Sequence, residues 1–124
     1  MSLNEELIER TRNRNNVLQL LEQYSDILEE KFGKTTLILF GSYARGDFNL
    51  WSDVDLIIIS DYFKNIRFID RAFKLPELYH DISYADTICW TLDEANKMLQ
   101  KNSWKSALKD AIIIKNDYNI ILQQ

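Results

Sequence analysis

Three aspartates are the residues of this chain best suited to metal chemistry. Asp53 and Asp55 stand two positions apart at the start of an apolar run, and Asp86 lies within a later stretch of strand-forming residues. Side chains two positions apart on a strand point to the same face, so the first two carboxylates are expected side by side. Such carboxylates repel unless a cation lies between them, and Mg²⁺ binds these oxygens together with waters and phosphates. The pattern predicts a magnesium site for in-line displacement at phosphorus, which two ions would share if Asp86 joins it.

A glycine–serine pair supplies the opposite end of this predicted site. Gly41 and Ser42 follow the apolar run 37–40, and a glycine there lets the backbone approach a ligand closely. If Ser42 to Arg45 forms a helical turn, the free amides at its start favour a phosphate. The Ser42 hydroxyl adds a donor, and Arg45 adds a positive charge. These residues predict a nucleoside triphosphate held by its phosphates opposite the carboxylates.

Apolar, β-branched runs must position these two ends. Residues 35–40 and 56–59 are predicted to be neighbouring buried strands, which hold the polar residues between them at one edge of a sheet. A third strand is predicted at 83–90, where Asp86 and Cys89 lie on opposite faces.

Helices are expected around these strands. A capping box at the N-terminus opens a predicted helix over about 3–32. A helix near 66–75 is expected to bury Ile69 and Phe73 and to expose Arg71 on its other side. Two further helices are predicted, one opened by the capping box Thr91–Glu94 and a C-terminal one over about 103–114.

Length and composition bound the fold and exclude several classes of function. The 124 residues fit one domain, 1–124, with its core at about 35–100. The order of elements predicts a small α+β domain, a mixed β-sheet with helices packed on it. A net charge of −4 and a pI near 5.0 argue against broad nucleic-acid binding. A single cysteine, Cys89, excludes an internal disulfide and a cysteine-based zinc site. No apolar run approaches the ~20 residues of a membrane span, and no secretory signal is recognised, so a cytoplasmic location is expected.

The spacing of the two motifs resembles that of a known family. The segment Gly41–Gly46 (GSYARG), followed by Ser52–Leu56 (SDVDL), is similar to the signature of the polymerase-β-like nucleotidyltransferase superfamily. More narrowly, it resembles the minimal nucleotidyltransferases that are paired with HEPN-domain partners. The pattern GSxxxGxxxxxSDxDL is matched at every fixed position. The stretch Asp86–Glu94 resembles the family's third-carboxylate strand and the start of the helix that follows it.

The resemblance implies roles for these residues and for the whole chain. The catalytic and metal-binding residues would be three carboxylates, Asp53, Asp55 and Asp86, and the nucleotide would be bound by four residues, Gly41, Ser42, Arg45 and Ser52. Such enzymes use ATP and Mg²⁺, with two ions expected, to transfer AMP to a hydroxyl acceptor and release pyrophosphate. In the HEPN-paired group the acceptor is a tyrosine of a partner toxin, so the chain would be an antitoxin that acts by adenylylation.

Other interpretations stay open on the sequence alone. The chain could be a binding module that neutralises a toxin by contact alone, or a nucleotidyltransferase for a small molecule such as an aminoglycoside, although those relatives carry an extra helical domain not seen here. Asp81 is the alternative third carboxylate. Trp51 stands where many relatives have a small, proline or basic residue. Arg10, Arg12 and Arg14 form a basic cluster that is either a solvated helix face or a contact with an anion or an acidic partner.

Overall fold

The structure is a computed structural model that describes residues 2–48, 53–77 and 85–122. Its α-helices, 3-10 helices and strands follow one another in this order: α1 (Leu3–Phe32), β1 (Thr36–Phe40), α2 (Ser42–Arg45), β2 (Val54–Ile59), η1 (Asp61–Phe63), η2 (Phe68–Lys74), β3 (Ala85–Trp90), α3 (Leu92–Met98), α4 (Asn102–Ala107) and β4 (Ile112–Asn116). Among these described elements, no helix combines the length and the apolar character that crossing a membrane requires.

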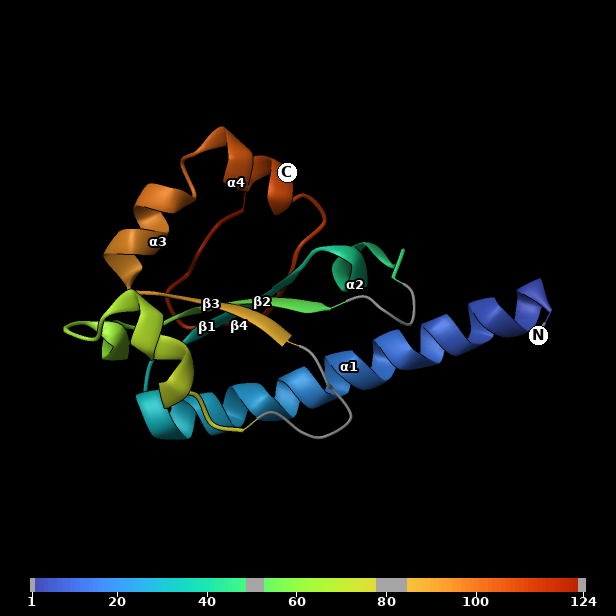
Figure 1. The fold of residues 1–124 in the computed structure, drawn as a ribbon, viewed down its shortest axis with the longest axis horizontal. Helices are drawn as coiled ribbons and strands as arrows, with labels where there is room; N and C mark the ends of the chain where they lie inside the picture. Colours follow the sequence, from blue (N-terminus) through green and yellow to red (C-terminus); the bar gives the residue numbers. More distant parts are fainter. Residues whose placement is uncertain (1, 49–52, 78–84, 123–124) are drawn as a thin grey trace.

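The strands form one mixed sheet in the order β3-β2-β1-β4. Strand β1 is antiparallel to both β2 and β4, whereas β2 and β3 are parallel. Parallel neighbours need a crossover connection, and the chain passes through η1 and η2 between these two strands. Helix α1 lies along one face of the sheet, and α3 and α4 lie on the other (Figure 1). The predicted fold class, a small mixed sheet with helices packed on it, is confirmed.

Each face of the sheet has its own buried core. Side chains alternate between the two faces along a strand. In β2, Leu56 and Ile58 belong to the core beneath α1, whereas Ile57 and Ile59 belong to the core beneath α3 and α4. By the same alternation, Asp55 faces the α3–α4 side of the sheet.

The N-terminal helix has the bounds predicted from the sequence, about 3–32. The Ser2 hydroxyl caps it by accepting a hydrogen bond from the Glu5 amide at 3.2 Å. Of the side chains that the structure describes, Val17 is the first buried one along the helix. The turns before it extend past the sheet (Figure 1). Packing of the later turns therefore fixes α1 to the sheet.

The C-terminal helix predicted over about 103–114 is wrong in its second half. Helix α4 ends at Ala107, Asp110 has a φ of 65°, and Ile112–Asn116 form β4 at the edge of the sheet. A right-handed helix does not continue through a residue of positive φ. The three isoleucines that begin β4 favour a strand, and β1 supplies their hydrogen-bonding partner. The sheet therefore includes a strand outside the predicted core of 35–100.

The helix predicted near 66–75 differs from the structure in type and in orientation. The segment forms the 3-10 helix η2, in which Ile69 is 70% and Phe73 86% exposed, whereas Arg71 is buried. The Arg71 guanidinium donates to two backbone carbonyls and to the carboxylate of Glu94, at 2.5 Å in the last case. A charge is buried at low cost only when it is paired and hydrogen-bonded. The partners on β3 and α3 turn Arg71 inward, whereas Arg67 and Lys74 stay exposed.

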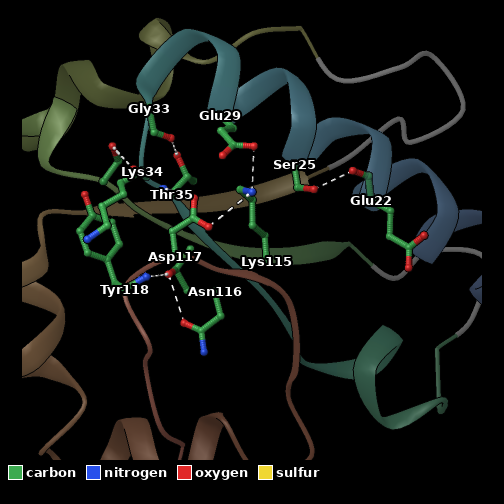
Figure 2. Close-up of polar contacts among 12 residues, drawn as sticks. Glu22, Ser25, Glu29, Gly33, Lys34, Thr35, Lys115, Asn116, Asp117 and Tyr118 are labelled. Carbon is green, nitrogen blue, oxygen red and sulfur yellow. Dashed lines mark hydrogen bonds and ion pairs between the residues drawn. The ribbon is translucent and has the colours of Figure 1, made fainter.

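Polar contacts tie the C-terminal strand to α1 and to the start of β1 (Figure 2). Lys115 Nζ lies 3.0 Å from Glu29 Oε2 and 3.5 Å from Asp117 Oδ1. The hydrogen bond to Glu29 is the main cause that raises the pKa of Lys115. Asp117 Oδ2 also accepts a hydrogen bond from the Thr35 amide at 3.0 Å. These contacts hold the edge strand β4 against α1 and the rest of the sheet.

Candidate functional site

A tight turn after β1 begins the candidate site. Gly41 has φ 77° and ψ −153°, a conformation that residues with a Cβ avoid, and the short helix α2 follows at once. The Ser42 carbonyl accepts hydrogen bonds from the amides of Gly46 (2.8 Å) and Asp47 (3.1 Å), which closes the turn. The helical turn predicted from Ser42 to Arg45 is confirmed.

Gly41 lies directly against the carboxylate of Asp55. A Cβ on Gly41 would stand 2.2 Å from Asp55 Oδ2 and 3.2 Å from its Cγ. Non-bonded atoms do not approach one another that closely, so only a glycine fits here without displacing the carboxylate. The glycine–serine turn and the aspartates therefore meet at one point of the structure.

Asp55 and Asp86 stand side by side on neighbouring strands. The register of the sheet pairs Asp55 of β2 with Asp86 of β3 on one side and with Phe40 of β1 on the other. Asp55 is half-buried and Asp86 is exposed. Asp53, immediately before β2, is also exposed. The three predicted carboxylates thus lie at the same edge of the sheet.

The pKa of Asp55 is raised above its ordinary value. Burial of the carboxyl is the main cause, the negative charges of Asp86 and Asp53 add to it, and the positive charge of Arg45 opposes it. Carboxylates that raise one another's pKa in this way are relieved by a bound cation. The electrostatics of this edge therefore favour a cation.

The donor chemistry of this edge fits a magnesium ion that shares its coordination shell with a substrate. In the part of the chain that the structure describes, no three His, Cys, Asp or Glu side chains are gathered into a ready-made metal site. Mg²⁺ is usually bound by only one or two carboxylates, with waters and substrate phosphates completing its shell. Asp55 and Asp86, with Asp53 close by, match that kind of site.

Of the four residues predicted to bind the nucleotide, three lie in the turn after β1. Arg45 ends α2, and its charge opposes the rise in the pKa of Asp55. The exposed Arg45 guanidinium pairs with Asp47, with Nε 3.2 Å from Oδ2. The fourth residue, Ser52, lies outside the described residues, as do Trp51 and the alternative carboxylate Asp81.

One contact of the candidate site was not predicted from the sequence. Arg14 of α1 donates from Nε to the Tyr43 carbonyl (3.0 Å) and from Nη2 to the Ala44 carbonyl (2.8 Å). The guanidinium of Arg14 thus binds the backbone of α2, while the side chains of Arg10 and Arg12 lie outside the part of the chain that the structure describes. A signal was available, because Arg14 precedes Val17 by three residues and so continues the stripe that is buried from Val17 to Leu21. The partner carbonyls, in contrast, leave no mark in the sequence.

Comparison with known proteins adds a family match and several similar sequences. Residues 21–117 match the family model described as nucleotidyltransferase domain. This span contains the turn after β1 and all three aspartates.

The similar sequences come from Methanocaldococcus jannaschii. "Putative protein adenylyltransferase MJ0126" is 31% identical over 98 residues, which cover 79% of this chain and 94% of that protein. "Putative protein adenylyltransferase MJ1305" is 39% identical over 69 residues, 52% of this chain and 45% of that protein. "Putative protein adenylyltransferase MJ0141" is 31% identical over 67 residues, 51% of this chain and 66% of that protein. The chain therefore matches only about half to two-thirds of the length of the last two relatives.

One solved structure has the same fold. It is the crystal structure of a "putative nucleotidyltransferase" from Sulfolobus solfataricus, with a TM-score of 0.64 and 20% sequence identity. The alignment covers 92% of this chain and 94% of that one.

Proposed function

The chain belongs to the nucleotidyltransferase domain family, and on this basis we propose that it transfers AMP from ATP to a hydroxyl group of a protein and releases pyrophosphate. The observation that carries the proposal is the contact between Gly41 and Asp55, where a Cβ would stand 2.2 Å from the carboxylate. It brings the turn that we propose to bind phosphate against carboxylates suited to a metal ion, as nucleotidyl transfer requires. The relatives from Methanocaldococcus jannaschii, which are named putative protein adenylyltransferases, support a protein acceptor.

The turn after β1 would bind the triphosphate. The backbone at Gly41 allows close approach of a phosphate, the Ser42 hydroxyl is a donor, and Arg45 contributes positive charge. Mg²⁺ held by the three aspartates would neutralise the negative charge that develops on the α-phosphate and on the leaving pyrophosphate. Ser52, the remaining nucleotide-binding residue of the motif, is proposed on the resemblance alone.

The transfer step needs a base for the acceptor hydroxyl. We assign it to Asp86, which is exposed on the edge strand β3 and can be reached by a large acceptor. The acceptor oxygen forms a bond to the α-phosphorus, the bond from that phosphorus to the bridging oxygen breaks, and Asp86 takes the hydroxyl proton. The turn holds the phosphates in line for this displacement.

The acceptor that we propose is a tyrosine of a HEPN-domain toxin, which the chain would neutralise as an antitoxin. The proposal rests on the resemblance of the GSxxxG and SDxDL motifs to the minimal nucleotidyltransferases. A tyrosine hydroxyl on a partner protein also suits an exposed base at the edge of a sheet, because a protein surface can dock there without entering a closed pocket.

Transfer to the neighbouring gene product tests the proposal. The chain would be incubated with Mg²⁺, ATP labelled at the α-phosphate and the protein encoded beside it, and label on that protein would be followed. We expect labelling with the parent chain and at least a ~100-fold loss with Asp53→Ala/Asp55→Ala, because the ion and the phosphates lose their ligands. Asp26→Asn is the matched control, since Asp26 is an exposed aspartate of α1 away from the site.

Two outcomes would replace the proposal with an alternative. Full neutralisation of a toxin by the Asp53→Ala/Asp55→Ala variant, without labelling, would indicate a binding module that acts by contact alone. Label that appears on a small molecule such as an aminoglycoside, and never on protein, would indicate a small-molecule nucleotidyltransferase.

A further inference from the structure

Arg14 completes the backbone hydrogen bonding of α2 from a distant helix. A short helix leaves its last carbonyls without intrahelical donors. In α2, the Ser42 carbonyl is satisfied by two amides beyond the helix. The next two carbonyls, of Tyr43 and Ala44, accept hydrogen bonds from Arg14 at 3.0 and 2.8 Å. Four residues are far too few for a helix to be stable alone, so α2 depends on such outside contacts.

The geometry of this contact is specific to arginine. Two adjacent carbonyls are bound at once by two N–H groups of one planar guanidinium. A lysine carries its donors on a single nitrogen, so it cannot span the two oxygens with the same rigidity. Ala44 is buried in the core that includes Val17 of α1, one turn beyond Arg14. The guanidinium therefore holds one end of α2 to a part of α1 that is itself fixed to the sheet.

The other end of α2 lies against the carboxylate of Asp55. At its start, Gly41 packs against Asp55 so closely that a Cβ would stand 2.2 Å from Oδ2. Because α2 is a single turn, a tilt at its Arg14 end moves Ser42 and Gly41 as one body. That movement changes the spacing between the turn and the carboxylate by an amount that transfer reactions do not tolerate, since ~1 Å of misplacement can cost about 100-fold in rate.

We propose that Arg14 is a positioning residue that fixes α2, and with it the nucleotide phosphates, relative to Asp55. The inference rests on the proposed function, because it concerns how that site binds ATP. In this role Arg14 acts on the nucleotide indirectly, through its hydrogen bonds to the backbone of α2.

The test compares Arg14→Lys and Arg14→Ala with the control Arg67→Ala. Arg67 is an exposed arginine paired with Asp70 at the start of η2, so its loss removes a charge without touching α2. Amide exchange of residues 42–47, affinity for a non-hydrolysable ATP analogue, and the KM for ATP and kcat of transfer would be measured for each. Circular dichroism at 25 °C checks that the fold is kept, and Arg14→Lys carries the test if Arg14→Ala unfolds.

We expect the Gly46 and Asp47 amides to exchange at least ~10-fold faster in both Arg14 variants, the analogue to bind about 10-fold more weakly, and the KM for ATP to rise by a similar factor. Added methylguanidinium should restore much of the affinity of Arg14→Ala and none of that of Asp55→Ala. Arg67→Ala should match the parent. A merely structural role of Arg14 would lower thermal stability, but the KM for ATP would stay at its parental value and methylguanidinium would have no effect on affinity.

The inference is overturned if exchange at residues 42–47 is unchanged, or if it rises while analogue affinity and KM stay at parental values. The proposed function fails separately. If the parent binds the analogue but labels no acceptor, exchange and affinity still decide the role of Arg14; if the parent binds no nucleotide, both proposals are wrong.

Discussion

Gly41 is the residue at which backbone geometry and the proposed chemistry are most closely linked. Its φ of 77° disfavours any side chain, and the carboxylate of Asp55 leaves no space for one. Gly41→Ala is therefore expected to lower the free energy of unfolding by roughly 2–4 kcal/mol, from backbone strain and overpacking together. Nucleotide transfer should fall by at least ~100-fold, because the turn and the carboxylate move apart. Urea denaturation and the transfer assay measure the two effects.

Gly33→Ala is the matched control for this prediction. Gly33 has nearly the same φ, 76°, but no atom lies within 4 Å of the place its Cβ would take. The control should lose only the roughly 1–2 kcal/mol of backbone strain and keep the parental transfer rate. Equal activity of the two alanine variants would contradict the proposed role of the Gly41 contact.

The ionised carboxylate of Asp55 is expected to lower the stability of the folded protein, although nucleotide transfer needs it. Its pKa is raised by burial and by the charges of Asp86 and Asp53. A raised folded-state pKa means that the stabilising contribution is present below the ordinary pKa of 3.8 and is lost as the pH rises through the folded-state value. Asp55→Asn should therefore unfold at higher urea at pH 7, with a gain of roughly 0.5–2 kcal/mol, and should lose transfer activity.

The pH dependence of stability distinguishes the loss of the Asp55 charge from a general effect of the substitution. The advantage of Asp55→Asn over the parent should shrink as the pH falls toward 3, because the parent carboxyl is then protonated. Asp26→Asn should show no such trend. An Asp55→Asn variant that is less stable than the parent at pH 7 would show that the carboxylate is not under electrostatic stress.

Elements with local signals were predictable from the sequence, and those decided by distant partners were not. The capping box Thr91–Glu94 opens α3 with both of its hydrogen bonds present, and α1 has its predicted bounds. In contrast, Arg71 of η2 is buried because it finds partners on β3 and α3. Strand β4 forms because β1 offers it an unpaired edge. The helical spacing of apolar residues near 66–75 and 103–114 carries no information about the partners of Arg71 or about the free edge of β1.

The ion pair between Arg71 and Glu94 is the contact on which the packing of η2, β3 and α3 is expected to depend. Burial opposes ionisation of Glu94, but the hydrogen bonds from Arg71 and Thr91 outweigh it and lower its pKa. Glu94→Gln can keep the capping box but leaves the buried guanidinium without a carboxylate. The variant should lose roughly 1–3 kcal/mol of stability at pH 7.

The lowered pKa of Glu94 also predicts how the stability lost in Glu94→Gln depends on pH. A lowered pKa gives stability that is present above the ordinary value of 4.5 and is lost as the pH falls through the folded-state value. The deficit of Glu94→Gln in urea denaturation should therefore shrink in acid. Asp93→Asn, the neighbouring exposed acid of α3, should cost less than about 1 kcal/mol. A Glu94→Gln variant as stable as the parent would show that Arg71 finds enough partners in the backbone carbonyls.

At the scale of the whole molecule, the sequence predicted that the aspartates lie at one edge of the sheet, but not the contacts that join the parts of the proposed site. Strand alternation placed Asp53 and Asp55 together, and the strand expected at 83–90 supplied Asp86. The pairing of Asp55 with Asp86 depends on the register of two parallel strands, which the intervening crossover and the core set together. The contact of Gly41 with Asp55 and the hydrogen bonds from Arg14 to α2 join residues far apart in the chain. Such contacts need the assembled fold.

Nucleotide and metal should stabilise the whole chain together. A ligand that binds only the folded state adds RT ln(1 + [L]/Kd), about 2.7 kcal/mol at 100 times Kd, which corresponds to a rise in Tm of several degrees. We expect this rise with ATP and Mg²⁺, and a much smaller one with ATP and a chelator, because the aspartates repel the phosphates without an ion between them. Differential scanning fluorimetry measures both. A shift of equal size in the chelator would contradict the metal-dependent site.

The most direct test of a nucleotidyl-transfer site is the fate of the two ends of ATP. Parallel reactions with label at the α-phosphate and at the γ-phosphate, in Mg²⁺ and with the proposed HEPN-domain acceptor, would be compared between the parent and Asp55→Asn. The site described here predicts that the parent places the α-label on the acceptor protein and releases the γ-label as pyrophosphate, and that Asp55→Asn does neither. Transfer of the γ-label to protein, or parental transfer of the α-label by Asp55→Asn, would contradict it.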